Sequence, residues 1–294
     1  MDEAIISRLK ALSAQSRFVE AKGATIHYLH WPNPHLPPLV LIHGHAAHAH
    51  WWDAVVWYLQ RDFDLYAIDL SGCGDSDHRT IYSYPLFTEE ILALCEDAQI
   101  SSPILVGHSF GGSIARVACY LEPGFAAKLL IVDSVLGPRR TASSPRPSSP
   151  SQNTKSPTRF YASIDQAIRR FRLRPPQAIQ HPAYIEHIAR HAIKETPQGA
   201  RFKLDLQLLA RFRPLDANLD PAAMLARLDM PKGLITGRHS VFFDPTTTEG
   251  EQNLLAAKAS FAPSSWYWVE DAAHHVLLDQ PEETAAIIRR FARQ

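Results

Sequence analysis

The stretch Val106-Gly107-His108-Ser109-Phe110-Gly111-Gly112 decides the fold of this chain. An apolar run over 104–106 leads into the pattern Gly-x-Ser-x-Gly, and a helical pattern over 113–121 follows directly. A strand, a sharp turn and a helix in this order form a nucleophile elbow, whose strained turn exposes the serine hydroxyl. The stretch therefore predicts that Ser109 is a nucleophile at the end of a strand. The N–H of Phe110 then faces an oxyanion from the N-terminus of the helix.

Apolar runs alternate with helical patterns on both sides of this stretch. Strands are expected over 38–42, 63–69, 104–106 and 128–132, and again over 233–236 and 266–269. Helices are expected over 51–60, 89–98 and 282–292, and the turn Lys22-Gly23 predicts a hairpin of strands over 17–20 and 25–31. Strands that alternate with helices form right-handed crossovers, so the sequence predicts a mostly parallel, doubly wound α/β sheet.

The alternation stops at Gly137. Residues 141–158 are rich in Pro and Ser, which predicts a flexible loop. Residues 164–228 show helical patterns and few strand signals. The sequence therefore predicts a core domain formed by residues 1–137 and 229–294, with a helical cap inserted over 138–228.

Composition excludes several classes of protein. The formal net charge of the 294 residues is zero, which gives no electrostatic case for a nucleic acid or an anionic membrane as partner. No apolar run approaches the length of a membrane span, and the first residues form no signal-peptide apolar region. An odd number of cysteines, three, favours free thiols in a reducing compartment. A cytoplasmic enzyme is the expectation.

Motifs along nearly the whole chain resemble the α/β-hydrolase fold family. They are His43-Gly44 after the third strand, Asp69 with Gly72-x-Gly74-x-Ser76 after the fourth, Gly107-x-Ser109-x-Gly111, and His274 ahead of Val276-Leu277-Leu278-Asp279-Gln280-Pro281. The resemblance implies an eight-stranded, mostly parallel sheet flanked by helices, with the cap inserted after the sixth strand. It also implies a serine hydrolase with a catalytic triad that needs no cofactor.

A serine hydroxyl needs a general base, because it is a poor nucleophile at its ordinary pKa. His274 and His275 both follow the strand expected over 266–269 and precede a helix, so both belong at the carboxyl edge of the sheet. In the family the base stands seven residues before the proline of the closing motif, here Pro281. The resemblance therefore selects His274 as the base and leaves His275 to packing or capping.

The triad acid departs from the common family pattern. Many relatives carry it three residues after the glycine that ends the seventh strand, and here Ser240 follows Gly237 at that spacing. Asp133, at the end of the sixth strand, and Asp244, shortly after Ser240, are both within reach of the imidazole. Asp244 also fits a helix N-cap with Pro245 at the first helical position. Asp133 is the preferred acid and Asp244 the alternative.

The second oxyanion N–H comes, in this fold, from the loop after the third strand, which selects the backbone of His45. The histidines of this loop stand two and three residues apart, a spacing that matches no recognised zinc motif. His187 and His191, four apart on a helix of the cap, are more typical of a polar helix face. No metal and no cofactor are therefore expected.

The candidates for lining the substrate pocket are Trp51 and Trp52 beside the oxyanion loop, and Phe171 in the cap. Tryptophans at helical spacing also fit a buried core. The arginines over 169–174 suit either a substrate carboxylate or, as the favoured interpretation, a solvated helix face. An uncharged, aromatic-flanked mouth predicts a medium or large hydrophobic ester or lactone as the small-molecule partner.

The cap phrase at 171–177, FRLRPPQ, together with Gly237-x-x-Ser240, resembles a subgroup of esterases that includes enzymes opening macrolide lactones. Cleavage of a carboxylic ester or lactone, such as a macrolide-type macrolactone, is the expected function. The alternatives are carbon–carbon bond hydrolysis of the meta-cleavage type and a non-catalytic ligand-binding protein on the same scaffold. The sequence does not determine the oligomeric state.

Overall fold

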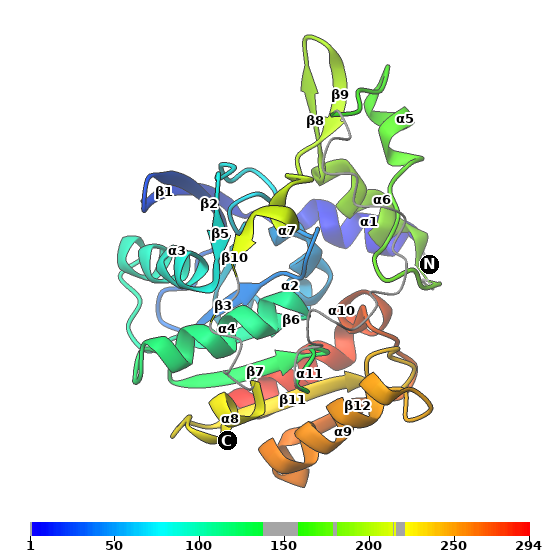
Figure 1. Cartoon of the computed structure of the whole chain (residues 1–294). Coiled ribbons are helices and arrows are strands. Elements are labelled where there is room, and N and C mark those ends of the chain that lie inside the picture. The colour runs from blue at the N-terminus through cyan, green and yellow to red at the C-terminus, as the bar shows by residue number, and fades with distance from the viewer. Residues whose placement is uncertain (1, 138–157, 179–180, 214, 216–220) are drawn as a thin grey trace.

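The computed structural model describes residues 2–137, 158–178, 181–213, 215 and 221–294. A twisted eight-stranded sheet runs through the centre of the molecule (Figure 1). Its strands are β1 (Gln15–Ala21), β2 (Ala24–Trp31), β3 (Pro38–Ile42), β4 (Asp64–Ile68), β6 (Ile104–His108), β7 (Lys128–Val132), β11 (Lys232–Gly237) and β12 (Trp266–Val269). Their order is β1-β2-β4-β3-β6-β7-β11-β12; β2 pairs antiparallel with β1 and β4, and the other pairs are parallel. The predicted mostly parallel sheet is confirmed.

Helices cover both faces of the sheet, because its strands are apolar on both sides. Successive side chains of a strand point to opposite faces, so Leu39 and Leu41 join one core cluster while Val40 and Ile42 join the other. The first cluster packs against α1, α2, α10 and α11, and the second against α3, α4, α8 and α9. These helices and the two 3-10 turns are α1 (Asp2–Ala11), η1 (Ala49–Trp52), α2 (Asp53–Leu59), α3 (Tyr84–Asp97), α4 (Phe110–Leu121), α8 (Pro221–Ala226), α9 (Thr248–Ser260), η2 (Pro263–Ser265), α10 (Val276–Asp279) and α11 (Pro281–Ala292).

The order of the strands reverses at β3. This strand pairs with β4 on one side and with β6 on the other, so the connections from β3 and from β6 leave the sheet at neighbouring strand ends. A reversal of this kind opens a crevice outside the carboxyl ends of the strands, where α/β proteins bind ligands. The stretch 106–112 and the loop after β3 both lie at this crevice.

The chain between β7 and β11, here termed the inserted segment (residues 138–228), is less helical than predicted. Its described elements besides α8 are α5 (Ile164–Ile168), α6 (Pro182–His191), β8 (Ile193–Thr196), β9 (Gly199–Phe202), α7 (Leu208–Arg211) and β10 (Phe212–Arg213). Residues 183–195 lie within the stretch predicted to be helical, but α6 ends at His191, because β-branched Ile193 and Thr196 and the turn before Gly199 favour a hairpin. Residues 141–157 of the predicted flexible loop lie outside the described residues.

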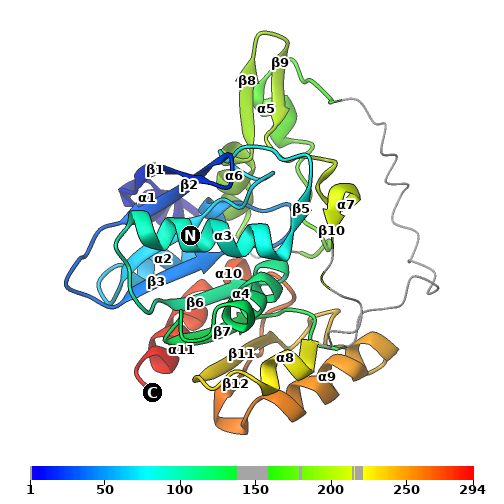
Figure 2. The ribbon, with the colours of Figure 1, turned by 60° about the vertical axis from the view of Figure 1, so that its left-hand side comes forward.

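The inserted segment contacts the core beside the crevice. In Figures 1 and 2 the β8–β9 hairpin, α5 and α6 lie together at the top of the molecule, beyond the sheet. Further along the segment, β10 pairs in parallel with the short strand β5 (Tyr82–Ser83) of the core. The segment is therefore joined to the core at several points along its length.

Helix α1 at the N-terminus was not predicted. Its Ile5 and Leu9, one helical turn apart, are buried against the first core cluster. The three cysteines are buried free thiols, as predicted. None of the helices in the described ranges has the length and apolarity needed to cross a bilayer.

A buried asparagine fastens the chain where it leaves β7. The Asn253 side-chain oxygen accepts hydrogen bonds from the N–H groups of Leu136, at 2.9 Å, and Gly137, at 2.7 Å. Its amide nitrogen donates to the carbonyl of Phe242 at 2.7 Å. Every polar atom of this side chain is thus used, and α9 is tied to the segment that follows β7 and to the segment that follows β11.

We expect Asn253→Ala to lower the free energy of unfolding by roughly 2–4 kcal/mol, because two buried N–H groups would lose their acceptor. Urea unfolding followed by circular dichroism measures this change. The control is Gln252→Ala on the neighbouring, exposed position. Equal stabilities of the two variants would contradict this role of Asn253.

Candidate active site

Ser109 occupies a strained backbone conformation between β6 and α4. Its φ of 54° and ψ of −119° lie outside the regions that L-residues favour. The backbone is crowded on both sides: a Cβ at Gly107 would overlap the carbonyl of Gly111, and one at Gly111 would overlap the carbonyls of Ile42 and His43. The strand and the helix therefore hold the turn in a shape that directs the serine away from the sheet.

Two backbone N–H groups lie near this serine without an acceptor in the described part of the chain. One belongs to Phe110, the first residue of α4, and the other to His45 in the loop after β3. The loop runs close to the serine, since a Cβ built on Gly44 would be 3.2 Å from the Cβ of Ser109. The rings of His45 and Phe110 are 6.3 Å apart. Both predicted oxyanion donors are thus brought to the same place as the predicted nucleophile.

The buried carboxylate at the end of β7 contacts the predicted base. His274 Nδ1 lies 2.8 Å from Asp133 Oδ1, and both side chains are almost fully buried. Asp133 accepts two further hydrogen bonds, from the hydroxyl of Ser240 at 2.6 Å and from the N–H of Gly237 at 2.9 Å. The carboxylate is held by three donors, so it fixes the orientation of the imidazole with little freedom of its own.

Asp244, the alternative acid, lies in a different setting. Its Oδ1 accepts from the N–H of Thr246 at 2.9 Å and from the Thr246 hydroxyl at 2.7 Å. Helix α9 is capped by Thr247, whose hydroxyl accepts from the N–H of Gly250, so the predicted N-cap at Asp244 is wrong by three residues. The structure brings Asp133, and not Asp244, to His274.

Further contacts place the loop of His274 next to the elbow. The ring of His108, the residue before Ser109, donates through Nε2 to the carbonyl of His274 at 3.0 Å. The two rings are 4.8 Å apart, and the ring of Phe242 packs on the other side of His274 at 4.7 Å. The Ser109 hydroxyl itself makes no hydrogen bond to any described residue.

His275 interacts with the inserted segment rather than with a carboxylate. Its backbone N–H donates to the Gln177 side-chain oxygen at 2.9 Å, and its Nε2 donates to the carbonyl of Pro175 at 3.1 Å. The amide nitrogen of Gln177 donates to Asp279, at 2.8 Å. Residues 175–177 of the inserted segment therefore clamp the loop that carries His274.

Sequence reasoning missed three supporting residues. They are His108, Ser240 and Gln177. His108 and Gln177 contact the loop of His274, and Ser240 contacts Asp133. A signal existed for two of them: Ser240 stands where relatives carry the acid, and Gln177 belongs to the phrase 171–177. Their partners lie 107 and 98 residues away in the chain, so only the fold connects them.

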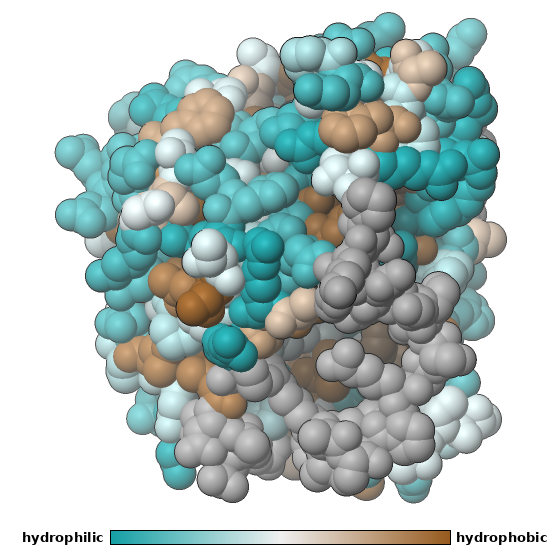
Figure 3. Space-filling view, turned by 45° about the horizontal axis from the view of Figure 1, so that its top comes forward, coloured by the Kyte–Doolittle hydropathy of each residue, from teal (hydrophilic) through white to brown (hydrophobic). Residues whose placement is uncertain are grey.

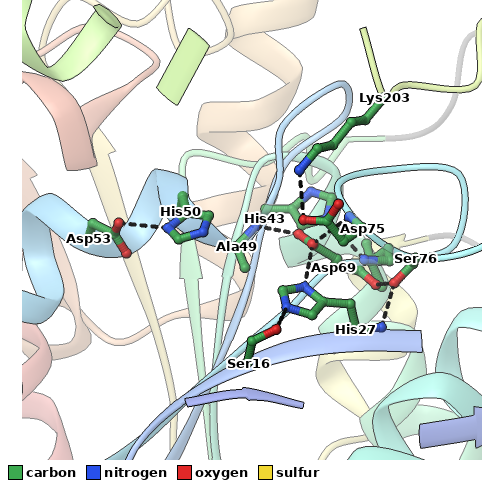
Figure 4. Close-up of polar contacts among 11 residues, drawn as sticks. Ser16, His27, His43, Ala49, His50, Asp53, Asp69, Asp75, Ser76 and Lys203 are labelled. Atoms are coloured by element: carbon green, nitrogen blue, oxygen red, sulfur yellow. Dashed lines mark hydrogen bonds and ion pairs between the residues drawn. The ribbon is translucent and has the colours of Figure 1, made fainter. Parts of the chain in front are cut away.

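Asp69 ties together the loops around the crevice (Figure 4). Its carboxylate accepts from the N–H of Ala49 at 2.6 Å, from the N–H of Asp75 at 2.9 Å and from His27 Nδ1 at 2.7 Å. Burial raises the pKa of Asp69, but the hydrogen bond and charge of His27 outweigh it, and the net pKa lies below the ordinary value. A stable carboxylate thus holds the loop after β3, which contains His45, against the loop after β4.

A cavity of about 200 Å³ lies between the loop after β3 and the inserted segment. Of the residues predicted to bind substrate, Trp51 and Phe171 line it, with ring centroids 6.4 Å apart. Trp52 does not line it, because its indole is fully buried in the core. The indole Nε1 of Trp51 and the Nδ1 of His45 are buried without a hydrogen-bond partner in the described chain, so they are available to a ligand.

The mouth of this cavity is cationic, not uncharged as predicted. Arg170, Arg172, Arg174 and Lys203 line it, and no acidic side chain does. Helix α5 ends at Ile168, so the arginines do not form the predicted helix face; they follow it at alternating positions of an irregular segment. None of the three has an ion-pair partner among the described residues. Figure 3, seen from the side of β8 and β9, shows a mainly hydrophilic surface with separate apolar patches.

A sequence model of the family described as "Alpha/beta hydrolase family" matches residues 39–287. The chain is 32% identical over 128 residues to the uncharacterized hydrolase YugF of Bacillus subtilis, covering 43% of this chain and 46% of that protein. It is 22% identical over 275 residues to a serine hydrolase-like protein of Danio rerio, covering 89% and 83%. The match to the first of these relatives therefore spans less than half of its length.

Solved structures show the same fold at low identity. The thioesterase domain from the curacin biosynthetic pathway superposes with a TM-score of 0.73 and 20% identity, over 94% of this chain and 99% of that one. A likeness at this identity concerns the arrangement of the backbone. It supports the strand order described above.

Buried neutral histidines predict acid sensitivity. Burial lowers the pKa of His43 and His108, and lowers that of His45 to about 4 and that of His275 to about 3. These bases protonate near pH 6.5 only after unfolding, so their contribution is complete above that pH and is lost as pH falls. We expect the free energy of unfolding to fall as pH drops below 6.5, by up to about 1.4 kcal/mol per pH unit for each of His45 and His275.

Urea titrations at pH 7, 6 and 5 measure this slope. The exposed His35 serves as control, because His35→Gln leaves it unchanged. A stability that stays constant from pH 7 to pH 5 would contradict the prediction.

Proposed function

Because this chain belongs to the alpha/beta hydrolase family, we propose that it is a serine hydrolase that cleaves a carboxylic ester or lactone. The main support for this proposal is the buried pair of Asp133 and His274, whose Oδ1 and Nδ1 atoms are 2.8 Å apart, beside the strained turn of Ser109. A nucleophile, an oriented base and two N–H donors in this arrangement are the groups that acyl transfer requires.

In the proposed reaction, the Ser109 oxygen attacks the substrate carbonyl while His274 Nε2 takes the hydroxyl proton. Asp133 accepts the hydrogen bond from the Nδ1–H group of His274, which keeps the proton on Nδ1, and its negative charge stabilises the imidazolium. The N–H groups of His45 and Phe110 hold the oxyanion of the tetrahedral intermediate. His274 then protonates the leaving alcohol, and a water that it deprotonates releases the acid from the acyl-enzyme.

We assign the inserted segment, residues 138–228, the role of a cap over the core formed by 1–137 and 229–294. Support comes from the cavity, since Trp51 and His45 of the core face Phe171 and Phe202 of the inserted segment across it. The contacts of Gln177 with the His274 loop add a direct link between the cap and the base.

The cavity supports a narrower substrate class, an ester or lactone that carries a carboxylate or another anionic group. Arg170 and Arg174 line the cavity without an ion-pair partner among the described residues, and the charge of Arg174 contributes to lowering the pKa of His45. An exposed guanidinium offers an anion a planar pair of donors. The apolar Trp51, Phe171 and Phe202 suit the hydrocarbon part of the same molecule.

The proposal predicts that a fluorophosphonate adds one adduct to the chain and that Ser109→Ala removes both the adduct and the hydrolysis of p-nitrophenyl esters. Asp133→Asn should lower kcat/KM roughly a thousandfold to ten-thousandfold, because the imidazole loses its orienting carboxylate. Asp244→Asn should leave it unchanged, since Asp244 bonds only within its own turn. Intact-mass spectrometry and ester kinetics provide the readouts.

The alternatives give different results. A ligand-binding protein shows no adduct and no turnover. A carbon–carbon bond hydrolase cleaves a dienoate diketone and leaves simple aryl esters intact. An Asp244→Asn variant as inactive as Asp133→Asn would overturn the assignment of the acid.

Arg170→Gln and Arg174→Gln should each raise the KM for an ester with a carboxylate roughly three- to tenfold and leave a neutral ester of the same shape unaffected. The control is Arg169→Gln, which lies next to them outside the cavity lining. Equal changes for the anionic and the neutral ester would rule out recognition of the charge.

A further inference from the structure

Four potential metal ligands from two distant parts of the chain meet beside the cavity. His50 and Asp53, three residues apart, lie on η1 and at the start of α2. His187 and His191, four residues apart, lie on α6 of the inserted segment. One ring nitrogen of each of the three histidines lies within 4.8 Å of those of the other two. Histidines four apart on one helix face are a known half of a zinc site.

Asp53 connects the two halves. Its Oδ2 lies 2.8 Å from His50 Nδ1, a contact drawn in Figure 4, and 2.7 Å from His187 Nε2. The Asp53 side chain is only 6% exposed, whereas the two imidazoles are about one-fifth exposed. A buried carboxylate held by two imidazoles is a common companion of histidines that bind metal.

The second carboxylate oxygen of Asp53 is an orphan. Asp53 Oδ1 is buried and has no hydrogen-bond partner among the described residues. A buried charged oxygen without a partner is costly, so such an atom usually marks a missing ligand, water or ion. It belongs to a carboxylate that contacts two of the three imidazoles, and imidazole is among the side chains that bind Zn²⁺ and related ions.

We propose that His50, His187, His191 and Asp53 form a binding site for one divalent transition-metal ion, with zinc as the best match. Three nitrogen ligands and one carboxylate oxygen make up a tetrahedral zinc set. The site lies outside the proposed catalytic residues and joins α6 of the inserted segment to η1 and α2 of the core. Its role is structural, because it connects two segments that are 134 residues apart through Asp53 and His187.

Two other groups of close ligands do not make the same case. In the group of His27, Asp69 and Asp75, both Asp69 oxygens already accept hydrogen bonds from the chain. In the group of His108, His274 and His275, every ring bonds to a carbonyl or to Asp133. Within the described ranges, only the group of His50, His187 and His191 adjoins a carboxylate with a buried oxygen that has no hydrogen-bond partner.

Metal binding requires one rearrangement. The rings of His50 and His191 are stacked, with centroids 3.6 Å apart and planes 20° apart. A lone pair in the plane of each ring must point at the ion, so parallel rings cannot both bind it. The His191 ring therefore turns out of the stack when the ion enters, and the ion takes the place of the two protons between Asp53 and the rings of His50 and His187, which are released to solvent.

The test starts from the full chain freed of metal by a chelator and dialysed against metal-free buffer. Zn²⁺ is then titrated in competition with a chromophoric indicator, and thermal unfolding is recorded with and without the ion. We expect one Zn²⁺ per chain and a higher Tm in its presence, because an ion bound only to the folded state stabilises it. Co²⁺ in the same site should give the intense visible absorption of a tetrahedral complex.

His187→Gln and His191→Gln should each abolish this binding and the rise in Tm. His181→Gln, at the start of the same helix but outside the cluster, should bind as the unchanged chain does. The metal-free Tm of each variant checks its folding, and Asp53→Asn replaces any variant that does not fold. Zinc binding of equal strength in His181→Gln and His191→Gln, or no binding by the unchanged chain, would overturn the proposal.

Discussion

The close passage of backbones at the end of β6 is the constraint on which the site depends. Gly107 and Gly111 leave no room for a side chain, since the carbonyls of Gly111, Ile42 and His43 occupy the space that a Cβ would need. This crowding packs β3, β6 and α4 together and forces Ser109 to a φ of 54°. A strained backbone of this kind persists only where the surrounding structure holds it in place. Here the surrounding structure is the packing of neighbouring elements at the point where the strand order reverses.

Asp133 shows how a departure in sequence is absorbed by the fold. Asp133, the proposed acid, follows β7, and Ser240 stands after β11, at the position where the family resemblance places the acid. That serine donates to Asp133 at 2.6 Å, so the neighbouring strand end still contributes to the same hydrogen-bond network. A carboxylate at either of two neighbouring strand ends can contact the same histidine, because the carboxyl ends of parallel strands meet at one edge of the sheet.

The sheet and the elbow were predictable from the sequence because their signals are local. Continuous apolar runs predicted β3, β7 and β12 to the residue. The choice of His274 came from the family resemblance, which places the base seven residues before Pro281. The preference for Asp133 over Asp244 agrees with the contact to His274, yet the sequence alone left both within reach. The inserted segment was predicted less well, since β8 and β9 follow a helix with no break in the helical pattern. The cationic mouth and the meeting of His50 with α6 depend on contacts between distant residues, which no local pattern reports.

The clamp formed by Gln177 has a consequence for exchanging parts between relatives. A segment inserted between two strands can be exchanged between relatives as a unit. The aim of such an exchange is to change the substrate preference without altering the residues of the proposed active site. Here the inserted segment holds the backbone of His275 and the carboxylate of Asp279, which lie at the start and at the end of α10, directly after His274. A chimera that imports a foreign segment would therefore keep Ser109, His274 and Asp133. The loop of His274 would nevertheless lose its contacts with the segment unless residues 175–177 of this chain are retained.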